Sequence, residues 1–159
     1  MRRAIQVYMA QQKETISTIN GLIETLKDGQ EGFRQAAEAV KDPQLKSLFN
    51  EYSQQRSRFA TVLQTHAKAL GEVKPGKTSS AAGAMHRAWI NLKSALTSGD
   101  DHAILAECER GEDSAVNEYK EALENGLTSS LRDIVSRQYR EVIVAHDRIK
   151  NLRDTAKKS

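Results

Sequence analysis

The sequence predicts an all-α protein, a four-helix bundle with a long crossover connection that carries a short extra helix. Composition favours helices, because the 159 residues include only 2 prolines and 9 glycines, and 5% are aromatic. Four long stretches also repeat apolar residues every three or four positions, which is the period of a helix with one buried face.

The first two helices are predicted from about Glu14 to Lys41 and from Pro43 to Leu70. Asp42-Pro43 separates them, because proline disfavours a helical conformation in the preceding residue and suits the first position of a helix. The apolar stripe of the first helix comprises Ile16, Ile19, Ile23, Leu26, Phe33, Ala37 and Val40. That of the second comprises Leu45, Leu48, Tyr52, Phe59, Val62, Leu63 and Leu70.

Residues 71–83, GEVKPGKTSSAAG, have the composition of a linker. A short helix follows, with an apolar side formed by Met85, Ala88, Trp89, Leu92 and Leu96. The third long helix is expected from Asp100, a capping residue, to about Glu124, and Asn125-Gly126 ends it. The fourth begins near Ser129 or Ser130 and buries Leu131, Val135, Val142, Ala145, Ile149 and Leu152.

The lengths of the connections predict how the helices are arranged. Helices one and two are joined by a tight turn, as are three and four, so each pair is expected to be antiparallel. The crossover, about residues 71–99, is long enough to run the length of the bundle, which is the ferritin-like arrangement. Trp89 is expected to hold the crossover on the bundle. An up-down-up-down bundle with a loose middle loop is the alternative. We expect one domain over residues 14–156 and an N-terminal extension, 1–13. This extension either lengthens the first helix, since Ile5, Tyr8 and Gln12 continue its stripe, or is disordered.

The string DDHAILAECERGED, residues 100–113, is the most acidic part of the chain. On a helical wheel Leu105, Cys108 and Ala115 face inward, and Cys108 is expected to be a small buried side chain. His102, Glu107, Glu109 and Asp113 lie off that stripe and are predicted to face solvent. Glu112 lies in the middle of the stripe, where a lone carboxylate is costly, so it should have a partner, be protonated or bind an ion.

Polar residues interrupt the other stripes at about the same level as Glu112, namely Gln30, Gln55, Gln138 and Glu141. One interpretation is a metal site that holds iron or manganese through Glu112 and Glu141. The other is a hydrogen-bonded layer without a cofactor. The sequence favours this second interpretation, because amides are weak metal ligands and the Glu-x-x-His motifs of a di-iron helical bundle are absent.

The sequence also disfavours several other classes of function. A single cysteine rules out a disulfide within the chain and fits a cytoplasmic protein. No apolar run is long enough for a membrane span. The net charge of +3 is interleaved along the chain, so nucleic-acid binding by the basic C-terminal tail is not favoured. His146-Asp147 could form a local pair, but no Ser or Cys nucleophile accompanies it.

Several strings resemble a bacterial family of ferritin-like four-helix-bundle proteins catalogued as a domain of unknown function. They are LKDGQEGFRQAAEAVKDPQLKSLF, QQRSRFATVLQ, AGAMHRAWINLKSAL, DDHAILAECERGED and HDRIKNLRD. The resemblance spans about Ile16 to Asp154 and implies the same fold and crossover, without an assigned reaction.

The functional expectation is therefore a non-enzymatic structural or interaction protein with a Gln/Glu polar layer in place of a di-iron site. Assembly as a homo-oligomer, a dimer in the simplest case, or with a protein partner could use Val7, Tyr8, Leu127 and Ile143. The alternative is a divergent iron- or manganese-binding protein.

Overall fold

A computed structural model of the chain describes residues 1–72, 75 and 89–156. Within these residues there is no strand, and the helices are α1 (Arg2–Ala39), α2 (Pro43–Ala69), α4 (Leu92–Thr97), α5 (Asp101–Glu124) and α6 (Ser129–Thr155). The prediction of an all-α fold with four long helices is confirmed. Residues 85–88 and most of the predicted linker lie outside the described residues.

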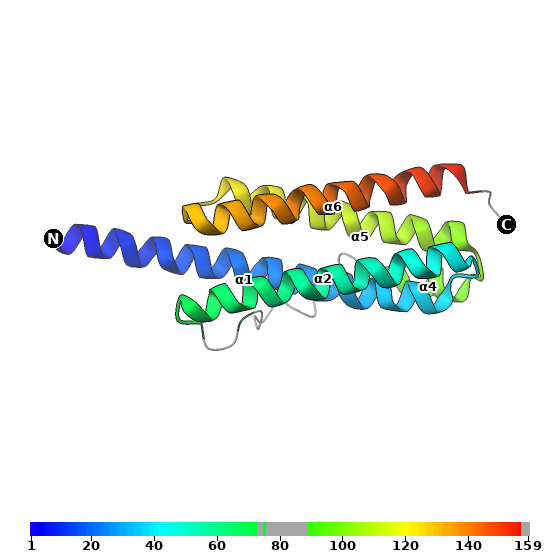
Figure 1. The fold of residues 1–159 in the computed structure, drawn as a ribbon, viewed down its shortest axis with the longest axis horizontal. Helices are drawn as coiled ribbons and strands as arrows, with labels where there is room; N and C mark the ends of the chain where they lie inside the picture. Colours follow the sequence, from blue (N-terminus) through cyan, green and yellow to red (C-terminus); the bar gives the residue numbers. More distant parts are fainter. Residues whose placement is uncertain (73–74, 76–88, 157–159) are drawn as a thin grey trace.

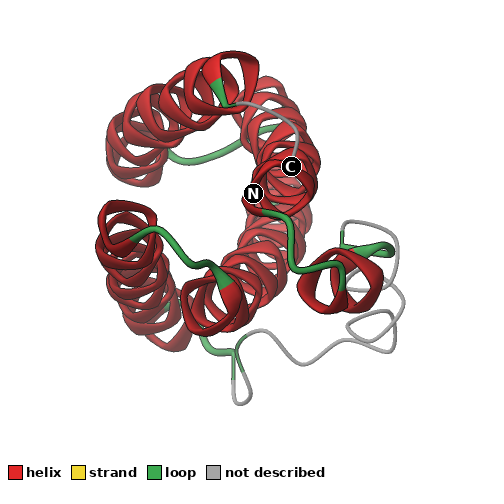
Figure 2. Cartoon of the chain, turned by 90° about the vertical axis from the view of Figure 1, so that its right-hand side faces the viewer, coloured by secondary structure: helices red, strands yellow, loops and turns green. Residues whose placement is uncertain are grey.

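The four long helices form two antiparallel hairpins, α1–α2 and α5–α6, which pack with α1 against α5 (Figures 1 and 2). Hydrogen bonds join the two hairpins at both ends of the bundle. The Asp101 carboxylate accepts from the backbone N–H groups of Lys41 and Asp42 at 2.9 and 3.0 Å. At the other end Thr15 Oγ1 donates to the carbonyl of Gly126 at 3.2 Å. Because α2 ends where α6 begins, the connection from α2 to α5 must cross the length of the bundle, as predicted (Figure 1).

The helix boundaries follow local capping chemistry. Asp42 caps α2 by accepting a hydrogen bond from the Gln44 N–H at 2.8 Å, and Pro43 occupies the first helical position. Asp100 caps α5 in the same way through the His102 N–H at 2.9 Å. The first helix begins at Arg2 instead of near Glu14, because no capping or breaking residue interrupts the pattern between them.

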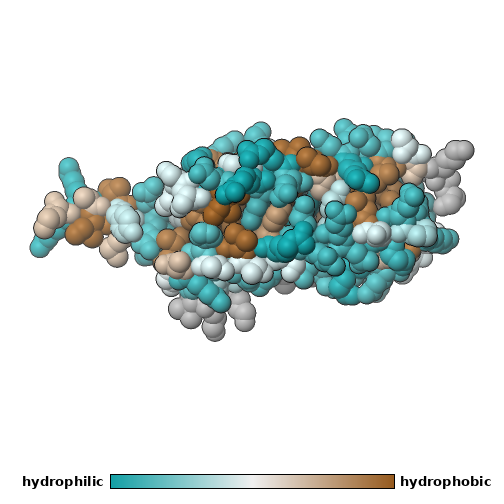
Figure 3. Space-filling model, viewed as in Figure 1, coloured by the Kyte–Doolittle hydropathy of each residue, from teal (hydrophilic) through white to brown (hydrophobic). Residues whose placement is uncertain are grey.

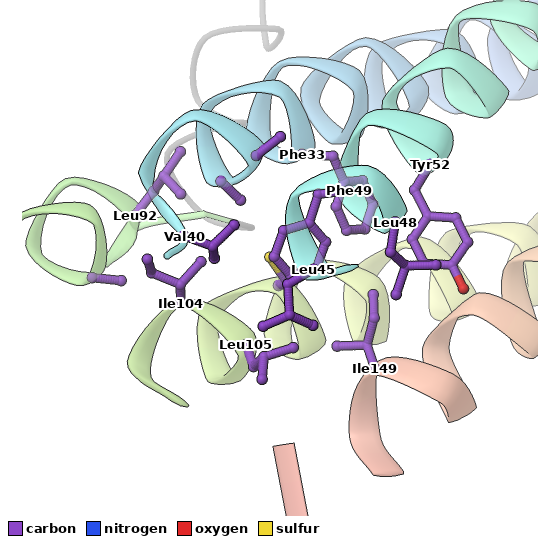
Figure 4. Close-up of a cluster of buried hydrophobic side chains, with 14 of the residues drawn as sticks. Phe33, Val40, Leu45, Leu48, Phe49, Tyr52, Leu92, Ile104, Leu105 and Ile149 are labelled. Atoms are coloured by element: carbon purple, nitrogen blue, oxygen red, sulfur yellow. The ribbon is translucent and has the colours of Figure 1, made fainter. Parts of the chain in front are cut away.

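The core consists of two apolar clusters placed one after the other along the bundle. The first surrounds Phe33, Phe49, Ile104 and Ile149 (Figure 4), and the second surrounds Ile23, Leu63, Tyr119, Val135 and Val142. Each fully buried large side chain contributes about 1.5–3 kcal/mol relative to an exposed one. Val62 is 41% exposed and does not belong to either cluster, because it is one residue, or about 100°, away from buried Leu63.

Trp89 anchors the crossover between α1 and α5, as the sequence predicts. It is buried, and its ring meets Phe33 edge-on with the centroids 5.5 Å apart. Gly32 on α1 and Gly111 on α5 provide the space for the indole. A Cβ at Gly32 would lie 2.8 Å from the indole carbons, and one at Gly111 would lie closer still. Two glycines inside helices are therefore explained by one side chain that packs between them.

Gly32→Ala should lower the free energy of unfolding by about 1–3 kcal/mol, because a rigid aromatic ring must move to admit the methyl group. Gly21→Ala, also on α1, is the control, since no atom lies within 4 Å of its added Cβ. This control should gain about 0.5–1 kcal/mol from helix propensity. Urea unfolding followed by Trp89 fluorescence compares the two, and equal effects of both variants would contradict the proposed packing.

Candidate functional site

The centre of the bundle holds a buried ion pair between Arg56 on α2 and Glu112 on α5. Both side chains are 1% exposed. Arg56 Nη2 donates to Glu112 Oε2 at 2.7 Å, and Nη1 donates to Oε1, so both carboxylate oxygens are engaged. Such a two-pronged contact is the geometry in which a guanidinium and a carboxylate bind most strongly. The predicted burial of Glu112 is confirmed, and of the three expected outcomes (a partner, a proton or a bound ion) the structure shows a partner, Arg56.

The ion pair separates the two apolar clusters. The described core has a gap between Tyr52 and Ala60 on α2 and between Cys108 and Ala115 on α5, and the pair occupies it. The guanidinium carbon also lies 5.4 Å from the centre of the Phe33 ring, within range of a cation–π contact. Burial opposes the charge of Arg56, but the Glu112 carboxylate outweighs burial and raises the pKa of the guanidinium.

A second buried polar contact lies next to the pair. Tyr119 OH donates to Gln138 Oε1 at 2.7 Å, and Gln138 Nε2 donates to the carbonyl of Phe59 at 3.4 Å. Burial raises the pKa of the Tyr119 hydroxyl, which therefore remains a neutral donor. Gln138 is buried and hydrogen-bonded, as the interpretation of a cofactor-free layer requires.

The other residues predicted for the layer lie at its edge or outside it. Gln30 and Gln55 are half-buried, and Gln55 Oε1 accepts from Arg56 Nε at 3.2 Å. Glu141 is exposed, so its predicted place in the buried layer is wrong, because residue 141 precedes the buried position Val142 by about 100°. Leu127, predicted for an interface, is buried as well.

These residues do not fit a ferritin-type di-metal centre. Such a centre needs carboxylates from all four helices, whereas α2 and α6 contribute Arg56 and Gln138 to the polar layer described above, and neither is a carboxylate. Its two oxygens are held by a fixed cation, which already neutralises the charge that metal ions would neutralise. The side chains at the bundle centre therefore favour a structural ion pair over a bound iron or manganese ion.

A cavity of about 70 Å³ adjoins the ion pair between α1 and α5, with Asp28, Arg56, Trp89 and Glu112 among its lining residues. A space of this size holds a few water molecules, whereas small-molecule sites measure about 300–1,000 Å³. Burial raises the pKa of Asp28 to about 7, and the neighbouring Glu24 carboxylate adds to the shift. Among the described residues, Asp28 is therefore a carboxyl group that gains a proton near neutral pH.

Glu107 and Glu109 are buried, which corrects the prediction that both face solvent. The crossover covers Glu107, whose Oε1 accepts from the Asn91 N–H at 3.3 Å. Arg153 of α6 covers Glu109 and forms an ion pair with it. Glu109, Asp113 and His146 form a group whose ligand atoms lie within 4.8 Å of one another, on the outside of the α5–α6 hairpin. Sequence reasoning missed this group, because Glu109 and Asp113 were assigned to solvent and His146 only to a pair with Asp147.

The two antiparallel hairpins and the long crossover between them are the fold of a ferritin-like helical domain. The chain belongs to the family described as Domain of unknown function (DUF2383), which matches residues 14–125. No curated protein sequence matches the chain significantly.

One similar solved structure is a two-domain protein from Anabaena variabilis that contains DJ-1/ThiJ/PfpI-like and ferritin-like domains. It superposes with a TM-score of 0.72 at 17% sequence identity over 93% of this chain, which shows a shared fold. The chain spans 42% of the length of that protein. In the described part of the chain, no helix is long and apolar enough to span a membrane.

Glu112→Ala should cost about 3–5 kcal/mol of stability, because it leaves the Arg56 charge buried without a partner. The double variant Arg56→Met/Glu112→Leu should recover most of that loss, since apolar side chains of similar volume avoid the desolvation cost. Chemical unfolding of Glu112→Ala, of the single variants Arg56→Met and Glu112→Leu, and of the double variant measures both effects. Losses that simply add would mean that the two side chains are not coupled.

Asp28→Asn should stabilise the protein above pH 7 and have little effect at pH 4. The raised pKa means that folded Asp28 keeps its proton while the unfolded chain loses it, so stability falls as pH rises from about 4 to about 7. An asparagine carries no such cost. The free energy of unfolding should rise by about 1 kcal/mol. This figure is smaller than the pKa shift alone would imply, because water partly screens the half-buried side chain. Unfolding curves across this pH range test it, with Asp133→Asn at an exposed position for comparison.

Proposed function

We propose that this protein is a non-enzymatic interaction protein that pairs with a second copy through residues 2–13 of α1. The observation that carries the proposal is the apolar face of this segment. The segment projects beyond the other helices (Figure 1), and brown, hydrophobic side chains extend along it in Figure 3. Ile5, Tyr8 and Met9 are exposed by 54%, 65% and 56% of their surfaces.

These side chains continue the stripe that forms the core further along α1. Ile5, Tyr8, Met9 and Gln12 follow the spacing of three and four residues that leads to buried Thr15 and Ile19. Gln12 Nε2 donates at 3.0 Å to the carbonyl of Leu70, the residue that caps the C-terminus of α2. The residues of α1 before Gln12 therefore extend past the end of α2. Beyond this level the apolar face has no helix of its own chain packed on it within the described residues.

A second copy offers a surface that matches this face. Most helical stability in proteins comes from packing of an apolar face, so a second helix on the exposed face of residues 2–13 would stabilise this end of α1. Two identical extensions related by a twofold axis would each cover the stripe of the other over about 18 Å of helix. The argument against a di-metal enzyme is the Arg56–Glu112 pair, which occupies the bundle centre.

Sedimentation equilibrium across a range of concentrations tests the proposal, because it measures the oligomeric state of the wild-type chain and of two lysine variants. Ile5→Lys should weaken the dimer by at least about tenfold, because it buries a charge in the interface. Val7→Lys is the matched control. The sequence alone placed Val7 among the interface residues. In the structure it is 66% exposed but lies two residues, or about 200°, around the helix from Ile5, so it falls outside the apolar face. A wild-type protein that is monomeric throughout, or equal effects of both variants, would contradict the proposal.

A further inference from the structure

The group on the α5–α6 hairpin combines the side chains that bind a transition-metal ion. Glu109 and Asp113 are four residues apart on α5 and therefore share one face of the helix. His146 reaches the same place from α6, and its Nε2 lies 2.5 Å from Asp113 Oδ1. One ligand atom from each residue lies within 4.8 Å of the other two. Small side-chain rotations would bring all three to the distance of about 2.0–2.2 Å at which Zn²⁺ binds nitrogen and oxygen.

The histidine is oriented as metal-binding histidines usually are. His146 Nδ1 lies 3.1 Å from Asp147 Oδ1, so this ring nitrogen can donate to a carboxylate while Nε2 points toward Asp113 and Glu109. A carboxylate on the far ring nitrogen fixes the tautomer and increases the basicity of the nitrogen that binds the metal. The arrangement therefore includes an outer partner as well as the three ligands.

Burial and charge are also suitable for a divalent ion. The Glu109 and His146 side chains are 11% and 17% exposed, whereas Asp113 is 54% exposed and gives access from solvent. Two carboxylates would balance the charge of the ion, and a neutral imidazole would complete three protein ligands, which leaves one position for water. Arg153 pairs with Glu109 Oε2 and would compete with the ion for that carboxylate.

We propose that Glu109, Asp113 and His146 form a Zn²⁺-binding site on the outside of the α5–α6 hairpin, with Asp147 as the positioning residue for His146. Zn²⁺ would bind Nε2 in place of its contact with Asp113 Oδ1, and the imidazole that binds the metal must be neutral. A mixed set of one imidazole and two carboxylates suits Zn²⁺ better than Mg²⁺ or Ca²⁺, which prefer oxygen alone. The site is independent of dimer formation and of the bundle centre.

The test is calorimetric titration of the purified full chain with ZnCl₂, supported by elemental analysis after desalting. We expect one Zn²⁺ per chain in the wild type and loss of that binding in His146→Ala. Asp147→Asn should weaken binding by about 10–100-fold, which is typical of the loss of an outer partner. Arg153→Gln should tighten it, because it removes the cation that competes for Glu109. His102→Ala, on the same hairpin but outside the group, is the control.

Two results would overturn the proposal. One is no stoichiometric Zn²⁺ binding by either the wild type or Arg153→Gln, which would make the group a network of ion pairs between two helices. The other is Zn²⁺ binding that survives His146→Ala. In that case the Arg56→Met/Glu112→Leu variant would show whether the ion binds at the bundle centre. Circular dichroism of each variant confirms that it is folded.

Discussion

The buried ion pair between Arg56 and Glu112 is the constraint on which the rest of the structure depends. A guanidinium and a carboxylate removed from water need each other at close range, so the α1–α2 and α5–α6 hairpins can pack only in the register that brings Arg56 and Glu112 together across the bundle. Apolar clusters on either side would tolerate several arrangements, because leucine and isoleucine pack without strict direction. The pair selects one of them. It also occupies the level at which a ferritin-like bundle would place its metal ions, so the same contact specifies the packing and disfavours that chemistry.

Helix α5 connects the separate parts of the molecule through three consecutive residues. Gly111 makes room for Trp89 and so attaches the crossover. Glu112 points to the centre and pairs with Arg56. Asp113 faces α6, where it contacts His146. Since successive residues of a helix point about 100° apart, one short string contributes to the crossover, the core and the outer hairpin. The neighbouring acidic residues Glu112 and Asp113 thus have separate structural roles, one in the bundle centre and one on the outer hairpin.

Periodicity was sufficient to predict the helices, the crossover and the burial of Glu112, because each depends on patterns within one segment. The partner of Glu112 was not predictable in this way. Gln55 and Arg56 are adjacent, and a shift of one residue turns a side chain from the edge of the bundle to its centre. Arg56 does follow Tyr52 and precede Ala60 by four residues, a spacing that could have identified it. The burial of Glu107 and Glu109 depends on the crossover and on Arg153, so it is a property of tertiary packing that no single helix reveals.

The most direct test of the central claim is a crystal structure of the protein grown anaerobically with Mn²⁺, with anomalous diffraction data to locate the metal. The account predicts that the Arg56 guanidinium lies against both oxygens of Glu112, with no anomalous peak between the helices at that level. A peak at about 2.2 Å from a Glu112 oxygen, with Arg56 displaced, would contradict it and would show that the bundle centre is a metal site.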